Sequence, residues 1–173
     1  VIAVNHSAIP LTASLNCRLI DLQGKTLDKL KLPVSLGPFT NSKPVNLPKA
    51  MNSPVCPQDA VLYVTLEIQS RTIAENTFLY LPDKYLDWPR ANIQTDLAIL
   101  TPCRYALTIT SNTVLKDLQL LMNPPAGFSD NFVDVLPSQP RRINFRTKYP
   151  LEVPVSFRLF SVGMPEGLDI TAG

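Results

Sequence analysis

The sequence is poor in glycine and in charged residues. It has six glycines among 173 residues, and only 17% of its residues are charged, against roughly 25% in typical soluble domains. So few glycines argue against a phosphate-binding loop, and no GxSxG or HExxH motif occurs. The formal net charge is +2, without runs of lysine or arginine. No nucleic-acid partner is therefore expected.

Residues that bind metals or form disulfides are scarce as well. The only histidine is His6, and the cysteines at positions 17, 56 and 103 are widely spaced, without a CxxC motif. These residues cannot form a zinc site or a Cys–His dyad, so no metal and no cofactor are expected. Cys17 alternates with apolar residues and is predicted to be a buried thiol, whereas pairing of the cysteines is left open. No apolar run approaches the ~20 residues of a membrane helix, so no membrane span is expected.

Proline, in contrast, is abundant, with 17 residues. Since proline breaks helix interiors, little room is left for long helices. The segments between the prolines alternate apolar and polar residues with the period of two that is typical of half-buried strands. Residues 25–36 favour a strand or loop over a helix, and the opening VIAVNHS resembles a strand, which suggests a fragment of a longer polypeptide. The other predicted strands are 13–19, 61–69, 77–81, 105–111, 114–122, 142–146 and 153–162.

About a dozen short strands bounded by turns are typical of β-sandwiches. Residues 81–90 interrupt the alternation with two prolines and the only tryptophan. Each side of this segment has the size of an immunoglobulin-like domain. We therefore predict an all-β fold of two tandem immunoglobulin-like β-sandwiches, residues 1–88 and 89–173, joined by a short elbow. Whether the first sandwich lacks its first strand is left open.

The stretch GFSDNFVDVLP holds the candidates for chemistry. Asp130 and Asp134 would share one face of a continuous strand, about 13 Å apart at a rise of ~3.3 Å per residue, which is long for the acid pair of a retaining glycosidase. The alternative is structural, because Asp130 and Asn131 can accept hydrogen bonds from nearby backbone amides while Phe132 and its neighbours fill the core. We favour a structural motif of Asp130, Asn131, Phe132 and Asp134, and we predict no catalytic residue.

Two further features have an ordinary alternative. Tyr85 and Trp88 are candidates for carbohydrate contact, but we favour their filling the junction between the two domains. Asn5-His6-Ser7 is formally a glycosylation sequon, yet His6 reads as an ordinary residue at a strand edge.

Two stretches resemble the β-mannosidases. AENTFLYLPDKYLDWPRANI, residues 74–93, resembles the end of the penultimate immunoglobulin-like domain of that family, where an aromatic strand runs into a P-x-K-x-L-x-x-P elbow. GFSDNFVDVLP, residues 127–137, resembles the FSDNFFDLLPGE signature of the final domain, with Val133 for the second Phe, Val135 for a Leu and Ser138-Gln139 for Gly-Glu. The opening VIAVNHS is similar to the V-x-V-x-N-D start of the penultimate domain, with His6 in place of an acid.

The resemblance implies an accessory region of a β-mannosidase-like glycoside hydrolase of family 2. Such enzymes carry two catalytic glutamates on a (β/α)8 barrel upstream of these domains, and the four glutamates of this sequence match no catalytic motif. The implied partner is that barrel, in the same polypeptide, and the implied parent cleaves terminal β-mannosides or related β-glycosides. Carbohydrate binding and homo-oligomer formation are left open. The alternatives are a carbohydrate-binding module, which predicts a flat face of exposed aromatic residues, and an adhesin-like structural protein without a catalytic domain.

Overall fold

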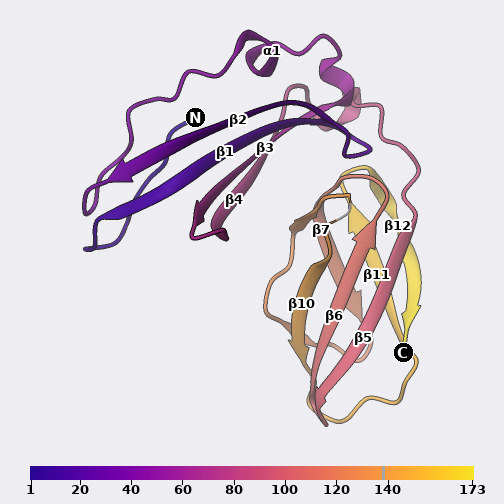
Figure 1. Cartoon of the computed structure of the whole chain (residues 1–173). Helices are drawn as coiled ribbons and strands as arrows, with labels where there is room; N and C mark the ends of the chain where they lie inside the picture. Colours follow the sequence, from indigo (N-terminus) through magenta and orange to yellow (C-terminus); the bar gives the residue numbers. More distant parts are fainter. Residues whose placement is uncertain (138) are drawn as a thin grey trace. The chain divides into compact units, whose positions relative to one another are not determined.

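The computed structural model of the chain describes residues 1–137 and 139–173, and these are almost entirely β-structure (Figure 1). They divide into two compact units, Val1–Asp87 and Trp88–Gly173, each described here by itself. Helical structure in the described residues is limited to α1 (Lys49–Asn52) and two 3₁₀ turns, η1 (Pro57–Asp59) and η2 (Asp83–Tyr85). None of these helical segments of the described chain has the length or apolar character needed to cross a membrane. The predicted all-β class is confirmed.

The first unit is built on one four-stranded antiparallel sheet. Its strands, in the spatial order β2-β1-β3-β4, are β1 (Leu11–Asp21), β2 (Thr26–Leu36), β3 (Ala60–Ile68) and β4 (Arg71–Leu79). The turn between β1 and β2 places Gly24 at a φ of +86°, where glycine is favoured. The turn between β3 and β4 places Gln69 and Ser70 at positive φ, as in the hairpin turns that match the twist of their strands.

Every second side chain of the central strand β1 is buried and contributes to the core of this unit. Ala13, Leu15, Cys17 and Leu19 of β1 are all buried on one face, as predicted, and pack with Leu62 of β3. The prediction of a buried thiol at Cys17 is confirmed, and burial raises the pKa of that thiol above its usual value. The cysteines at positions 17, 56 and 103 are all free.

Irregular chain covers the buried face of this sheet. The predicted opening strand is wrong, because residues 1–10 form only an isolated bridge, between Val4 and Asn41. The facing segment contains prolines at 38, 44 and 48, and proline has no N–H to donate to a strand ladder. Single backbone bonds replace the ladder, such as Ser42 N–H to Ala3 O at 2.8 Å. The second layer of this unit therefore consists of irregular segments and of α1, whose Met51 is fully buried in the same core.

Asn5 fastens this covering layer. Its side chain is 5% exposed, and its Nδ2 donates hydrogen bonds to the carbonyl oxygens of Ile9 (2.8 Å) and Gly37 (2.9 Å). Its Oδ1 accepts the backbone N–H of Ser7 at 3.0 Å. A glycan would be attached to this same Nδ2, so the buried and doubly bonded amide makes the sequon unsuitable for glycosylation. His6 is exposed beside the Val4 bridge and lies on no strand.

The second unit is a complete β-sandwich. One sheet has the order β5-β6-β10-β8 and the other the order β12-β11-β7-β9, all antiparallel. The strands are β5 (Ile93–Thr101), β6 (Arg104–Ser111), β7 (Leu115–Met122), β8 (Gly127–Phe128), β9 (Val133–Val135), β10 (Arg141–Arg146), β11 (Val155–Ser161) and β12 (Met164–Ala172). Between the sheets lie fully or nearly fully buried side chains from both, among them Tyr105, Leu107, Ile109, Leu118, Leu120, Ile143, Phe145, Phe157 and Leu159.

Two strands that the sequence analysis missed and one that it shortened by several residues lie at sheet edges. β5 and β12 were not predicted and β4 was expected to be shorter, and each of the three is an edge strand. An edge strand buries few side chains, and residues 71–76 of β4 are all exposed. β12 contains Pro165 and Gly167, which an edge strand tolerates. Without a buried face, these strands have little of the alternation on which the prediction depends.

We expect Asn5→Ala to lower the free energy of unfolding by about 1 to 3 kcal/mol, because it leaves partly buried backbone groups unsatisfied. The exposed Asn46 of the same covering layer is the matched control, and Asn46→Ala should change the stability by less than about 0.5 kcal/mol. Urea unfolding of both variants measures the difference. Equal urea midpoints would show that Asn5 does not hold this layer.

Candidate functional site

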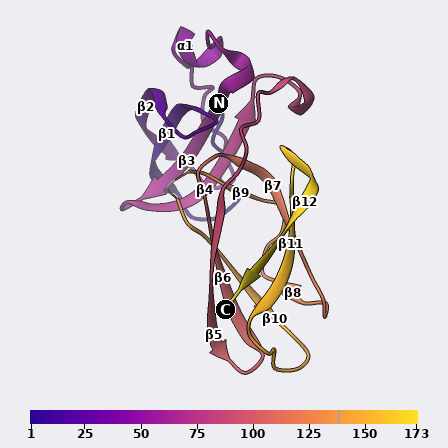
Figure 2. The same cartoon turned by 90° about the vertical axis from the view of Figure 1, so that its right-hand side faces the viewer.

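The stretch 127–137 carries the chain from one sheet of the second unit to the other. Gly127–Phe128 forms β8, beside β10 in the first sheet, and Val133–Val135 forms β9, beside β7 in the second (Figure 2). Asp130 and Asp134 therefore do not share a continuous strand, so the common strand face considered for a glycosidase pair does not arise. Ser138, which replaces the Gly of the FSDNFFDLLPGE signature, lies outside the described residues.

Asn131 extends the pairing of β7 beyond the end of β9. Its Oδ1 accepts the backbone N–H of Leu120 at 2.8 Å, and its Nδ2 donates to the carbonyl oxygen of Leu120 at 3.2 Å. The pairing of Leu118 with Val133 places residue 120 opposite residue 131, so the side-chain amide serves where a strand backbone would. Asp130 Oδ1 accepts the N–H of Asn131 at 3.0 Å, and its Oδ2 lies 4.0 Å from a guanidinium nitrogen of Arg141.

Phe132 does not contribute to the core as predicted. Its side chain is 60% exposed, whereas Val133, Val135 and Leu136 of the same stretch are at most 5% exposed. The backbone of Phe132 has a φ of +61°, which is uncommon for a bulky residue. This conformation interrupts the alternation of inward and outward side chains at the point where the chain changes sheets. The side chain of Phe132 therefore faces outward.

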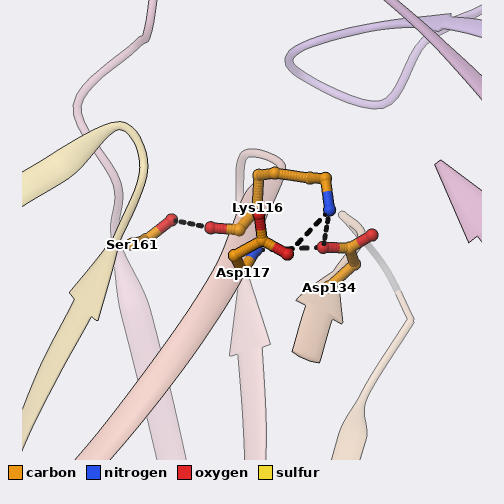
Figure 3. Close-up of polar contacts among 4 residues, drawn as sticks. All are labelled: Lys116, Asp117, Asp134 and Ser161. Carbon is orange, nitrogen blue, oxygen red and sulfur yellow. Dashed lines mark hydrogen bonds and ion pairs between the residues drawn. The ribbon is translucent and has the colours of Figure 1, made fainter. Parts of the chain in front are cut away.

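Asp134 belongs to a cluster of one ammonium group and two carboxylates (Figure 3). The pairing of β7 with β9 shifts between Leu115 and Leu118, so that Lys116 and Asp117 together oppose Asp134, as in a β-bulge. Lys116 Nζ lies 2.8 Å from Asp117 Oδ1 and 3.0 Å from Asp134 Oδ1. The N–H of Asp117, whose φ is +52°, also donates to Asp134 Oδ1 at 3.0 Å.

The bulge is also held from β11. Ser161 Oγ donates to the carbonyl oxygen of Lys116 at 2.8 Å (Figure 3), and Val162 N–H donates to the same oxygen at 3.1 Å. Lys116 is therefore fixed at both its backbone and its ammonium group. The extra residue of β7 consequently has hydrogen bonds on each side of the strand.

The electrostatics of this cluster favour a structural role. Burial alone would lower the pKa of Lys116, but the hydrogen bonds and charges of Asp117 and Asp134 outweigh burial and raise that pKa above 10.5. The charged ammonium occupies the space between the two carboxylates. A glycosidase needs such a space for the scissile bond, and here the Lys116 ammonium fills it between Asp117 and Asp134. The sequence analysis missed Lys116 and Asp117, because their contact with Asp134 depends on the bulge.

Tyr85 and Trp88 belong to different units. Tyr85, in η2 of the first unit, is 58% exposed, and Lys84 Nζ lies 4.9 Å from its ring centroid. Trp88, in the second unit, borders a hollow of about 640 Å³ together with Arg90 and Glu166. A Cβ at Gly163 would lie 2.7 Å from the Trp88 ring, so only glycine fits beneath it. Among the residues that the structure describes, no group of three His, Cys, Asp or Glu side chains is placed to hold a metal ion.

A comparison of two alanine variants, at Phe157 and at Phe132, tests whether the side chain of Phe132 faces outward. Phe157 is 2% exposed and contacts Phe145 edge to face, so Phe157→Ala should lower the free energy of unfolding by roughly 3 to 5 kcal/mol. Phe132→Ala removes an exposed ring and should cost less than about 1 kcal/mol. Urea unfolding of the two variants measures the order, and a larger loss for Phe132→Ala would contradict the structure.

The raised pKa of Lys116 predicts a stability difference that disappears at alkaline pH. Lys116→Met removes the ammonium that lies between two carboxylates, and we expect a loss of about 1 to 3 kcal/mol near neutral pH. The pKa of Lys116 in the folded protein lies above the ordinary value of 10.5. The stabilisation by its ammonium group is therefore complete at pH values below 10.5 and is lost as the pH rises through the folded-state pKa. Urea unfolding of parent and variant across this range measures the difference. Exposed Lys148 is the control, since Lys148→Met should show little difference at any pH, and a Lys116 difference that persists at the alkaline end would refute the assignment.

Two family models match the chain in succession, a mannosidase Ig/CBM-like domain over residues 1–85 and an Ig-fold domain over residues 88–156. No curated protein sequence matches the chain. Among solved structures, a β-D-mannosidase from Dictyoglomus thermophilum is similar, with 19% identity, a TM-score of 0.74 and 92% of this chain covered. An exo-chitosanase from Amycolatopsis orientalis is similar over 99% of this chain, with 11% identity and a TM-score of 0.62.

The chain covers 20% of that mannosidase and 25% of that exo-chitosanase. At these identities, the likeness to the two structures establishes the fold. The order of the two matched domains agrees with the resemblance of residues 74–93 and 127–137 to the β-mannosidases. The chain is thus a tandem pair of immunoglobulin-like domains of the mannosidase type.

Proposed function

We propose that this chain is a non-catalytic accessory region of a β-mannosidase-like glycoside hydrolase. In this proposal its two domains, with the predicted bounds 1–88 and 89–173, pack on an upstream (β/α)8 barrel and support it. The succession of the two matched domain types along the chain carries the proposal. The similar structures are a β-mannosidase and an exo-chitosanase. The parent enzyme would accordingly act on terminal β-mannosides or related β-glycosides.

The engagement of the polar motif residues supports a non-catalytic role. Asn131 bonds the backbone of β7 in both directions, and Asp134 accepts from Lys116 and from the Asp117 backbone. A catalytic acid needs a pKa matched to its task and access to substrate. Asp134 instead accepts hydrogen bonds inside the fold, so the chemistry would belong to the proposed barrel.

Carbohydrate contact by Trp88 is a second proposal, of a different class. Tryptophan combines a large apolar face with a polar N–H, and this one borders a hollow of about 640 Å³ with Arg90 and Glu166. Such a hollow falls within the size range of small-ligand sites, roughly 300 to 1,000 Å³. A role of the same ring in the junction between the domains is the alternative.

We expect the purified chain to hydrolyse neither aryl β-mannosides nor aryl β-glucosaminides, because it offers no free acid pair in the motif. Chromogenic assays with both substrates measure this. Turnover that disappears in Asp134→Asn would overturn the non-catalytic assignment. In the same samples, mannobiose titration by calorimetry, with Trp88→Ala as the variant, tests the second proposal.

The supporting role is tested on the longer polypeptide. Its upstream sequence should encode a (β/α)8 barrel with two acidic catalytic residues. Removal of the present chain should lower the melting temperature of that barrel, since the buried contact surface would be exposed to water. A barrel that melts at the same temperature with and without the chain would argue against support.

A further inference from the structure

A second hollow, of about 430 Å³, lies on the sheet β5-β6-β10-β8 of the second unit. Tyr105 and Phe145 on these strands point into the core and are at most 3% exposed. Because side chains alternate along a strand, the neighbouring Arg104 and Arg146 point to the outer face, where both are exposed. The hollow is lined by the exposed residues Leu100, Arg104, Gly127, Ser129, Asn144 and Arg146 and, at its base, by the core residues Tyr105, Phe128 and Phe145.

The two arginines stand directly opposite each other. Arg146 of β10 is paired in register with Arg104 of β6, and directly opposed side chains in an antiparallel pair have Cβ atoms about 5 Å apart. Arginine remains charged at all ordinary pH values, so this arrangement is repulsive. Within the described part of the chain, neither guanidinium is paired with a carboxylate. A bound anion would relieve the repulsion.

The neighbouring strand leaves room for one of these arginines. Gly127 of β8 is paired with Arg146, and a Cβ at Gly127 would lie 3.3 Å from Arg146 Nε and 3.4 Å from its Cγ. The missing side chain therefore lets Arg146 lie across β8, at the rim of the hollow (β8 and β10 are labelled in Figure 2). Ser129 fixes that rim, because its N–H donates to the carbonyl oxygen of Asn144 at 2.7 Å and its Oγ accepts the N–H of Asn144 at 3.1 Å.

We propose that this hollow binds the carboxylate of an acidic saccharide, such as a uronic acid residue, between Arg104 and Arg146. The guanidinium group matches a carboxylate with two parallel hydrogen bonds. The exposed apolar side chain of Leu100 suits the C–H face of a sugar ring, and the exposed side chain of Asn144 can bond a hydroxyl group. The choice of a saccharide as carrier of the carboxylate rests on the proposed function, whereas the anion site rests on the two arginines.

The test is a calorimetric titration of the whole chain with glucuronate, with glucose as the neutral analogue and acetate as the carboxylate alone. Glucuronate should bind, and Arg104→Gln or Arg146→Gln should weaken that binding by about tenfold or more, the loss expected for a charge-assisted hydrogen bond. Arg142→Gln is the matched control, because Arg142 lies on the same face of β10 but outside the hollow, and it should leave the affinity unchanged. Glucose and acetate should each bind at least about tenfold more weakly than glucuronate.

The stability of the variants separates a binding role from a structural one. Because the arginines repel each other, Arg104→Gln should melt at or above the temperature of the parent, while glucuronate should raise the melting temperature of the parent only.

Four outcomes would overturn the proposal: no binding of glucuronate, equal weakening by Arg142→Gln, equal affinity for acetate, or binding of an acidic peptide in place of glucuronate. The barrel-support experiment is independent of this titration. A missing glucuronate site therefore leaves the accessory role intact, and a missing supporting role leaves the anion site intact.

Discussion

The hydrogen bonds between the Asn131 side chain and the Leu120 backbone hold the second unit together where its chain changes sheets. β9 is only three residues long, so on this side of β7 the backbone groups of Leu120 would lack a partner if the amide of Asn131 did not take that place. Buried backbone groups need partners, and an unsatisfied one costs about 1 to 3 kcal/mol. The short β9 and the change from β8 to β9 within a few residues both depend on this side chain.

The same requirement explains how Asp134 of the motif is engaged. A β-bulge leaves an extra residue on one strand, and here the extra residue brings Lys116 and Asp117 opposite Asp134. The ammonium of Lys116 offsets part of the negative charge at the bulge, and Asp134 accepts a hydrogen bond from its backbone. The first unit uses a comparable device, in which the amide of Asn5 binds two carbonyl oxygens where prolines prevent a strand ladder. In both units, polar side chains complete the hydrogen bonding that the strands leave unfinished.

Central strands could be predicted from the sequence, whereas edge strands and local reversals could not. Alternation in β1, β6 and β11 reflects burial on one face, as in the buried series Val155, Phe157 and Leu159. β5 and β12 lie at sheet edges and bury too little to show it. Phe132 was expected in the core because it is aromatic, but its positive φ turns it outward. The opening residues have strand composition, yet the prolines facing them allow only one bridge.

The sequence by itself determined the all-β class and the scarcity of catalytic residues, because proline content, alternation and missing motifs are properties of the chain alone. The resemblance of residues 127–137 to the β-mannosidases was likewise readable from the amino acids. Only the tertiary structure decided which residues meet. Lys116 reaches Asp134 through a register shift between strands, and Arg104 faces Arg146 across 42 residues through the pairing of β6 with β10. Such pairs follow from the register between strands that are distant in the sequence, and that register is fixed only when the buried faces of the strands pack together.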